Sequence, residues 1–385
     1  AFGYATLATD TEGEKSTAIG YSALATQNFA TATNAYNVAV GYHAGLAVTT
    51  GTQNTLIGGL AGDAITDADG NVAVGYASLT ANVLGSDSVA IGKNALNLQN
   101  PATATAMHNV AIGKNTGEAI TTGVQNTLVG SLAGDALNTG ENNTAFGVSA
   151  LGADTKGDVS VAIGHSALSS QNFTTNTDSQ NTAVGYNAGL SVTTGIQNAL
   201  FGHVSGDSLT DADHNTAIGA FSLNSDTLGS KSVAVGAGTL SSQNFTTATD
   251  ARNVAVGYAA GNVITTGQYN VLMGTFAGDA LTTGGENVAI GDAALSAEDA
   301  HGRNVAIGQE ALKVQNAGAN AYNVAVGYQA GHDITTGVQN VILGAFTADA
   351  VTTGSYNTAI GDQALGSNTK GSLSTAVGQA ALYTQ

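Results

Sequence analysis

The stretch Asn37–Gly41, with the sequence Asn-Val-Ala-Val-Gly, decides the fold because the rest of the chain repeats it. It returns as Asn-Thr-Leu-Ile-Gly at 54–58 and as Ser-Val-Ala-Ile-Gly at 88–92, and its last copy occupies 374–378. Counting a truncated first copy that ends at Gly3, the chain contains 22 copies. Self-similarity at a fixed short period is the signature of a repeat protein, in which one small unit is stacked many times.

The glycine that ends each copy measures the period. Most steps between successive glycines are equal, and every fourth step is four positions longer, as from Gly92 to Gly113. The last of these long steps, from Gly308 to Gly327, is two positions shorter than the others. Blocks of four coils therefore recur, which indicates duplication of a four-coil unit. We expect one continuous repeat region over 1–385, within a longer polypeptide.

The composition excludes several classes of protein. The chain of 385 residues has 52 glycines, one proline and no cysteine, and only 9% of its residues are charged, with a net charge of −18. An acidic chain without a Lys/Arg stripe is not expected to bind nucleic acid. No apolar run is long enough for a membrane span, so we expect no membrane insertion. The absence of cysteine fits a surface or virion fibre that is stabilised by packing.

Short β-strands, rather than helices, are expected at each pentapeptide. Valine, threonine, asparagine and glycine recur throughout, and no apolar stripe of helical period is sustained. β-branched segments between Gly/Asn/Thr turns are typical of short strands. Equivalent strands of successive coils can pair in parallel, about 4.8 Å apart. The sequence therefore predicts an all-β fold, a parallel β-solenoid of about 22 coils.

Both faces of the predicted strand are apolar or small. By the alternation of side chains, Val38 and Val40 face one way while Asn37 and Ala39 face the other. One face can line the interior of the coil, and the other needs a cover, for which a second copy of the chain is the simplest source. We expect a homo-oligomer, and we select as interface candidates the large residues that replace alanine in the second coil of each block: Leu56, Leu128, Leu200, Leu272 and Ile342.

The long fourth loop of each block is the expected binding side. Extra residues in a solenoid leave the stack as loops, often on one face. After a Gln-Asn pair, most of these loops carry an aromatic residue or a proline. We predict that these residues lie on the surface and contact a receptor: Phe29, Pro101, Phe173 and Phe245.

The Asn-x-Ala-Val/Ile-Gly-x-x-Ala pattern, as in Asn-Thr-Ala-Val-Gly-Tyr-Asn-Ala at 181–188, resembles known head repeats. It is similar to those of trimeric autotransporter adhesins and to arrays of the same coil length in phage tail fibres. The resemblance implies a left-handed β-roll, a homotrimeric fibre and an extracellular location on a cell surface or virion. It also implies a host-surface glycan or protein as receptor.

Metal and catalytic sites find little support in the sequence. Two acidic pairs resemble half of a calcium loop, so calcium is the one cofactor that we keep open, with the candidates Asp67, Asp69, Asp211 and Asp213. The seven histidines are scattered without metal-ligand spacing or a partnered carboxylate, and we interpret them as surface variation. We assign no catalytic residue and expect no enzyme.

The main hypothesis is a structural and adhesive fibre segment. Three alternatives stay open. The first is an extracellular filament subunit that assembles end to end. The second is a β-helix enzyme, either an acyltransferase or a polysaccharide-cleaving tail spike, although a catalytic site should break the repeat at one place. The third is ice binding through threonine arrays, although the Thr-Thr-Gly turn of the first coil recurs only once per block.

Overall fold

The computed structural model of the chain describes residues 1–384, in which every regular element is a β-strand and no helix occurs. The predicted fold class is confirmed: the chain is a parallel β-solenoid in which strands of successive coils pair with one another. Contacts divide the chain into two compact units, Ala1–Ile196 and Gln197–Gln385, and each is described by itself. The single continuous region stays a prediction.

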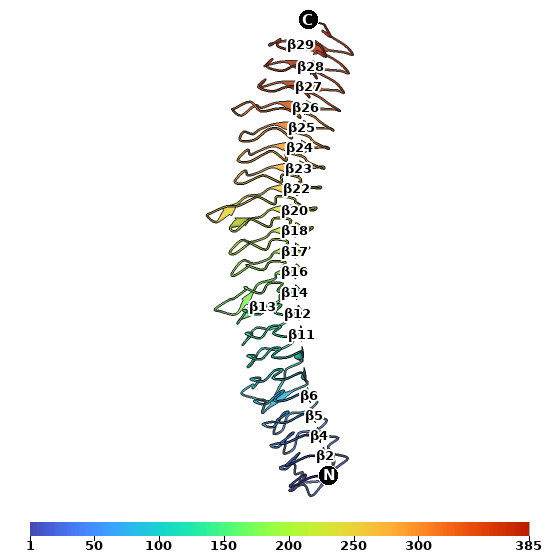
Figure 1. The fold of residues 1–385 in the computed structure, drawn as a ribbon, viewed down its shortest axis with the longest axis vertical. Helices are drawn as coiled ribbons and strands as arrows, with labels where there is room; N and C mark the ends of the chain where they lie inside the picture. Colours follow the sequence, from blue (N-terminus) through green and yellow to red (C-terminus); the bar gives the residue numbers. More distant parts are fainter. Residues whose placement is uncertain (385) are drawn as a thin grey trace. The chain divides into compact units, whose positions relative to one another are not determined.

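Unit 1 contains ten three-residue strands that form one parallel ladder, in which strands of successive coils within the unit pair with one another. Figure 1 shows several of them at successive levels of the stack. They are β2 (Thr17–Ile19), β4 (Val38–Val40), β5 (Thr55–Ile57), β6 (Val72–Val74), β8 (Val89–Ile91), β10 (Val110–Ile112), β11 (Thr127–Val129), β12 (Thr144–Phe146), β14 (Val161–Ile163) and β16 (Thr182–Val184).

Unit 2 contains eleven such strands in the same arrangement. They are β17 (Ala199–Phe201), β18 (Thr216–Ile218), β20 (Val233–Val235), β22 (Val254–Val256), β23 (Val271–Met273), β24 (Val288–Ile290), β25 (Val305–Ile307), β26 (Val324–Val326), β27 (Val341–Leu343), β28 (Thr358–Ile360) and β29 (Thr375–Val377).

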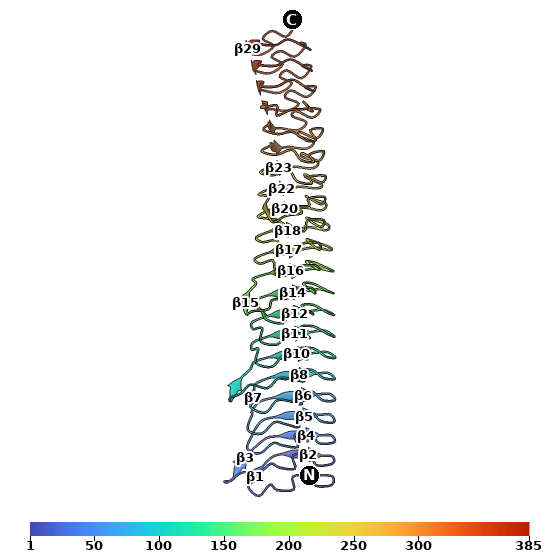
Figure 2. The same cartoon turned by 90° about the vertical axis from the view of Figure 1, so that its left-hand side faces the viewer.

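Shorter strands mark the long loops. Each of the first four blocks adds a pair of two-residue parallel strands (Figure 2 labels β1, β3, β7 and β15). The pairs are β1 (Gly13–Glu14) with β3 (Thr33–Asn34), β7 (Gly85–Ser86) with β9 (Thr105–Ala106), β13 (Gly157–Asp158) with β15 (Thr177–Asp178), and β19 (Gly229–Ser230) with β21 (Thr249–Asp250). The described residues of the fifth block, where the long step is two positions shorter, have no such pair.

The register of the ladder places equivalent residues directly over one another. Val38 pairs with Thr55, Ala39 with Leu56, and so on at every step. The middle residue of each strand is buried, and the two residues beside it are half-buried or exposed. This alternation is the period of a strand with one face toward the core. The middle residue of each strand points into the interior of the coil, and in most coils this residue is a small alanine.

A buried ladder of asparagine side chains supports the start of each strand. Asn54 is fully buried; its Oδ1 accepts a hydrogen bond from the backbone N–H of Asn71 at 3.0 Å, and its Nδ2 donates to the carbonyl of Ala68 at 2.8 Å. The same two bonds recur in most coils, for example at Asn126. Each asparagine side chain thus pairs a backbone N–H and a backbone carbonyl that would otherwise be buried without a partner. This is the reason that asparagine recurs at this position.

The glycine that ends the pentapeptide satisfies two separate demands. Gly41 has a φ of +145°, which L side chains rarely adopt. A Cβ atom on Gly41 would also lie 2.4 Å from the carbonyl oxygen of Gly58 in the next coil. Any other residue at this point would both strain the turn and push the coils apart, so the glycine recurs in every coil.

Candidate functional site

The outward face of the parallel ladder is the most extensive candidate surface in each unit. It consists of the first and third residues of the three-residue strands, and we call it the ladder face. None of these strands contains a charged residue; the two positions carry only valine, isoleucine, leucine, phenylalanine, methionine, alanine or threonine. A large exposed face without charges that is rich in apolar residues marks an interaction surface.

Within the ladder face, most of the exposed large apolar residues stand at the third strand position. Ile57 is 38% exposed and Phe146 is 57% exposed, whereas Leu56, between Thr55 and Ile57, is fully buried. Exposed residues at this position in unit 1 are Ile19, Ile57, Ile91, Ile112, Phe146 and Ile163. Those in unit 2 are Phe201, Ile218, Met273, Leu343 and Val377.

Aromatic rings extend from the ends of these strands. Tyrosines that follow the pentapeptide glycine stack across successive coils: the ring centroids of Tyr4 and Tyr21 lie 5.1 Å apart, and those of Tyr21 and Tyr42 lie 5.6 Å apart. All three rings are exposed. Exposed stacked rings offer flat apolar surface with a polar hydroxyl, which suits contact with a protein or a sugar ring.

The interface candidates of the sequence analysis lie on the wrong face. Leu56, Leu128, Leu200, Leu272 and Ile342 are buried inside the coil of their own chain. They fill interior space that nearby glycines leave open, because a Cβ atom on Gly62 would lie 2.8 Å from Leu56 Cδ2. The opposite face of the strands, which carries mainly valine and isoleucine, is the exposed one. It is therefore this face, and not the face with the selected leucines, that needs a cover.

The binding-loop candidates are also misplaced. Phe29, Pro101, Phe173 and Phe245 are buried rather than displayed. Phe245 packs over Gly229, where an added Cβ would lie 2.8 Å from the ring, and its backbone N–H donates to Asp226. The aromatic residue anchors its loop, and the exposed tip consists of the small residues Thr246, Thr247 and Ala248.

The calcium candidates use their carboxylates within the chain. Asp67 Oδ1 accepts hydrogen bonds from the hydroxyls of Thr49 and Thr50 at 2.7 and 2.8 Å, and these bonds lower the pKa of Asp67. Asp69 Oδ1 accepts from the N–H of Thr52 at 2.6 Å. In the described residues no third carboxylate or histidine joins either Asp67 and Asp69 or Asp211 and Asp213 in a metal-ligand group. Calcium binding at these aspartates stays a prediction.

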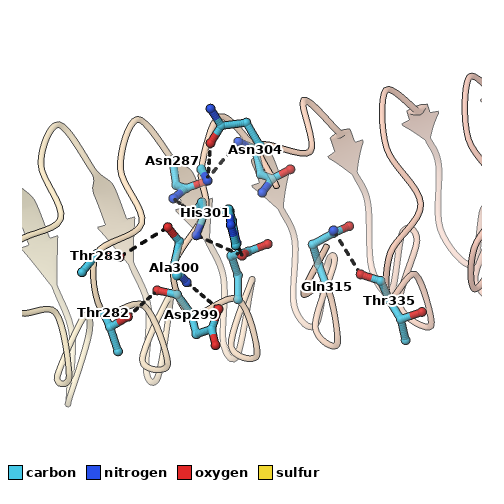
Figure 3. A network of polar contacts seen from close by, with 12 residues as sticks. Thr282, Thr283, Asn287, Asp299, Ala300, His301, Asn304, Gln315 and Thr335 are labelled. Atoms are coloured by element: carbon cyan, nitrogen blue, oxygen red, sulfur yellow. Dashed lines mark hydrogen bonds and ion pairs between the residues drawn. The ribbon is translucent and has the colours of Figure 1, made fainter. Parts of the chain in front are cut away.

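The fifth block departs from the repeat at Glu298 and His301, which sequence reasoning missed. Glu298 stands where earlier blocks have Asp154 and Asp226, and His301 stands where they have Gly157 and Gly229. His301 is therefore not surface variation: its Nδ1 lies 3.7 Å from Oε1 of the buried Glu298. Figure 3 shows His301 in a network of polar contacts. The replacement of a repeated glycine by histidine, beside a shortened loop, is the sequence signal for this cluster.

No protein-family model matches the chain, and no curated protein matches its sequence. None of the described residues belongs to a helix that could cross a membrane.

Proposed function

We propose that this chain is a structural and adhesive segment of an extracellular fibre, on a cell surface or a virion, that associates with copies of itself through the ladder face. The observation that carries this proposal is the uncharged, exposed ladder face described above. Burial of apolar surface contributes roughly 25 cal/mol per Å² to association, and a long apolar strip gains more from an equally long partner than from a small ligand.

A second copy of the chain fits this face better than an unrelated partner. Coils of an identical copy repeat at the same step of about 4.8 Å, so side chains of two adjacent ladders stay in register over many coils. The net charge of −18 opposes association, but none of the charged groups lies in the three-residue strands themselves. Three copies around a common axis, as the resemblance to adhesin heads implies, would bury the ladder face of each copy against the two other copies.

Adhesion is the second part of the proposal. Each block carries a loop tip of small residues, so an oligomer would present similar small contacts many times. Repetition of weak contacts raises overall avidity without a deep pocket. A glycan or protein on a host surface is the proposed receptor, with the exposed tyrosines as additional contacts.

The self-association is tested by the native mass of the chain in solution, measured by light scattering. One chain has a mass of 37.9 kDa, and the proposal predicts three times that value. A variant with Ile91→Glu, Ile112→Glu and Phe146→Glu should be monomeric with an unchanged circular dichroism spectrum. A matched control carries three glutamates at exposed positions away from the ladder face, at Leu98, Asn100 and Thr175. A monomeric wild-type chain, or a variant that stays trimeric, would overturn the proposal.

A further inference from the structure

We propose that Glu298, Asp299 and His301 form a binding site for a divalent transition-metal ion of the zinc class. One ligand atom from each of the three residues lies within 4.8 Å of the others. All three residues belong to a single turn. This site is separate from the ladder face, and the inference does not rest on the proposed fibre function.

Earlier blocks show what this turn normally contains. Asp226 is fully buried there: Oδ1 accepts from the N–H of Gly229 at 3.0 Å, and Oδ2 accepts from Nε2 of Gln243 at 2.5 Å. Asp154 makes the equivalent bonds with Gly157 and Gln171. The buried carboxylate is thus fully satisfied by hydrogen bonds, as a buried charge must be.

The fifth block loses the glutamine partner. Glu298 is fully buried, and its Oε1 accepts a long hydrogen bond of 3.3 Å from the N–H of His301. Its Oε2 is buried without any hydrogen-bond partner. Gln315, which corresponds to Gln243, donates instead to the carbonyl of Thr335 at 3.2 Å (Figure 3). A buried carboxylate oxygen without a donor is costly, and a cation is a partner that removes this cost.

A second ligand atom is also without a hydrogen bond. Nδ1 of His301 is buried and unpaired apart from its approach to Glu298, while the ring as a whole is 30% exposed. Asp299 is exposed, so the site is open to solvent on one side. An ion can therefore enter past Asp299 and reach two inner atoms that lack other partners.

The backbone of the turn is fixed by the preceding coil. The carbonyl of Asp299 accepts from Thr282 Oγ1 at 2.9 Å, that of Ala300 from Thr283 Oγ1 at 3.4 Å, and that of His301 from Asn287 Nδ2 at 3.4 Å (Figure 3). Three consecutive carbonyls are thus held by three side chains. Fixed backbone lowers the entropy lost when the side chains converge on an ion.

The ligand types favour zinc-like ions over calcium or magnesium. Calcium and magnesium prefer oxygen ligands alone, whereas imidazole with carboxylates suits zinc, cobalt or nickel. Ligand atoms about 2.1 Å from a tetrahedral ion lie about 3.4 Å apart. From its 4.8 Å limit the observed cluster needs to contract by at most about 1.4 Å, and the exposed Asp299 can rotate to do so.

The test is a metal titration of the full chain after treatment with a chelator. Zinc is titrated by calorimetry, and cobalt by the visible absorption of tetrahedral Co²⁺. We expect one ion per chain. The variant Glu298→Asp/His301→Gly restores the residues of the fourth block and should fold; we expect it to bind at least about tenfold more weakly. Asp299→Asn, at an exposed position, is a second variant with the same expected loss. His165→Ala is the matched control and should bind like wild type.

Thermal unfolding provides a readout that a merely structural role would not move. Zinc should raise the Tm of wild type progressively as its free concentration exceeds the Kd, and at the same zinc concentration it should raise the Tm of the double variant less. The proposal is overturned if wild type binds neither ion, or if both variants bind as tightly as wild type does. If wild type binds no ion and the Glu298→Gln variant is more stable than wild type, the proposal is also overturned. Glu298 is then simply a buried acid that is protonated in the folded chain.

Discussion

Gly45 leaves open the space that the side chain of Leu56 fills. A Cβ atom on Gly45 would lie 2.6 Å from Leu56 Cδ1, and Gly45 has a φ of +58°. The large residue at the second coil of a block and the glycine of the neighbouring turn are therefore a matched pair. The pairing recurs at Leu128 with Gly117 and Gly134, at Leu200 with Gly206, at Leu272 with Gly261 and Gly278, and at Ile342 with Gly331.

The first prediction tests this pair. Leu56→Ala should lower the free energy of unfolding by about 2–5 kcal/mol, because it leaves a cavity in a narrow interior. Gly45→Ala should also destabilise the chain, since the new methyl group collides with Leu56. In the double variant the collision is absent, so its cost should be smaller than the sum of the two single costs. Chemical denaturation measures all three, with the exposed Leu98→Ala as a control expected to change stability little. Strict additivity would contradict the pairing.

The pair of Gly45 and Leu56 also shows which part of the fold could not be predicted from the sequence. The repeat predicted the strand positions, the parallel ladder and the alternation of faces, because each follows from a period that is visible in the residues. The choice of the interior face did not follow, since Ala39 and Val40 are both apolar and alternation alone treats them equally. Leu56 fits the interior because Gly45 and Gly62 leave space for its side chain, and the sequence pattern alone does not show which glycines lie beside it.

The predictions for the long loops and for His301 were wrong for a different reason. Hydrophobic residues such as Phe245 can anchor a loop as well as present it, and the space over Gly229 that decides between them is a tertiary property. His301 was dismissed because metal-ligand spacing was sought in isolation. Comparison of equivalent positions across blocks, Gly229 against His301, contained the signal.

The second prediction concerns the asparagine ladder. Asn126→Ala would leave the carbonyl of Gly140 and the N–H of Asn143 without their partners. Each buried unpaired group costs about 1–3 kcal/mol, so we expect a total loss of about 2–6 kcal/mol. Asn100→Ala, at an exposed position, is the control and should stay within about 0.5 kcal/mol of wild type. Equal effects of the two variants in thermal or chemical unfolding would show that the ladder contributes nothing specific.

The third prediction is a rise in stability on mild acidification. Burial raises the pKa of the aspartates that recur in the second coil of each block, Asp63, Asp135, Asp207, Asp279 and Asp349. A carboxyl whose pKa is higher in the folded state binds protons more readily when folded. Its contribution is therefore fully present below the ordinary aspartate pKa of about 3.9 and is lost as the pH rises through the raised value.

Stability should accordingly increase as the pH falls from 7 toward about 4.5. Hydrogen bonds lower the pKa of Asp67, and hydrogen-bonded ion pairs lower the pKa of Asp250, which opposes this trend, but both groups are largely exposed and contribute less. A variant with asparagine at the five recurrent positions should be more stable than wild type at pH 7 and show a flatter pH profile. A steady loss of wild-type stability from pH 7 to 5 would contradict the prediction.

The last prediction separates anchoring from display in the long loops. Phe245 is only 4% exposed, and its ring covers Gly229, so Phe245→Ala should cost about 3–5 kcal/mol of local stability. The loss should appear as faster amide hydrogen exchange and easier proteolysis across 229–253, while the more distant coils of unit 2 stay protected.

Substitution of the exposed Thr247 by alanine should leave amide hydrogen exchange unchanged. Thr247 is therefore the position to vary in receptor-binding assays. The fifth block, which carries Ala317 in place of the aromatic residue, should exchange fastest even in wild type. Unchanged protection in Phe245→Ala would mean that the ring does not hold the loop.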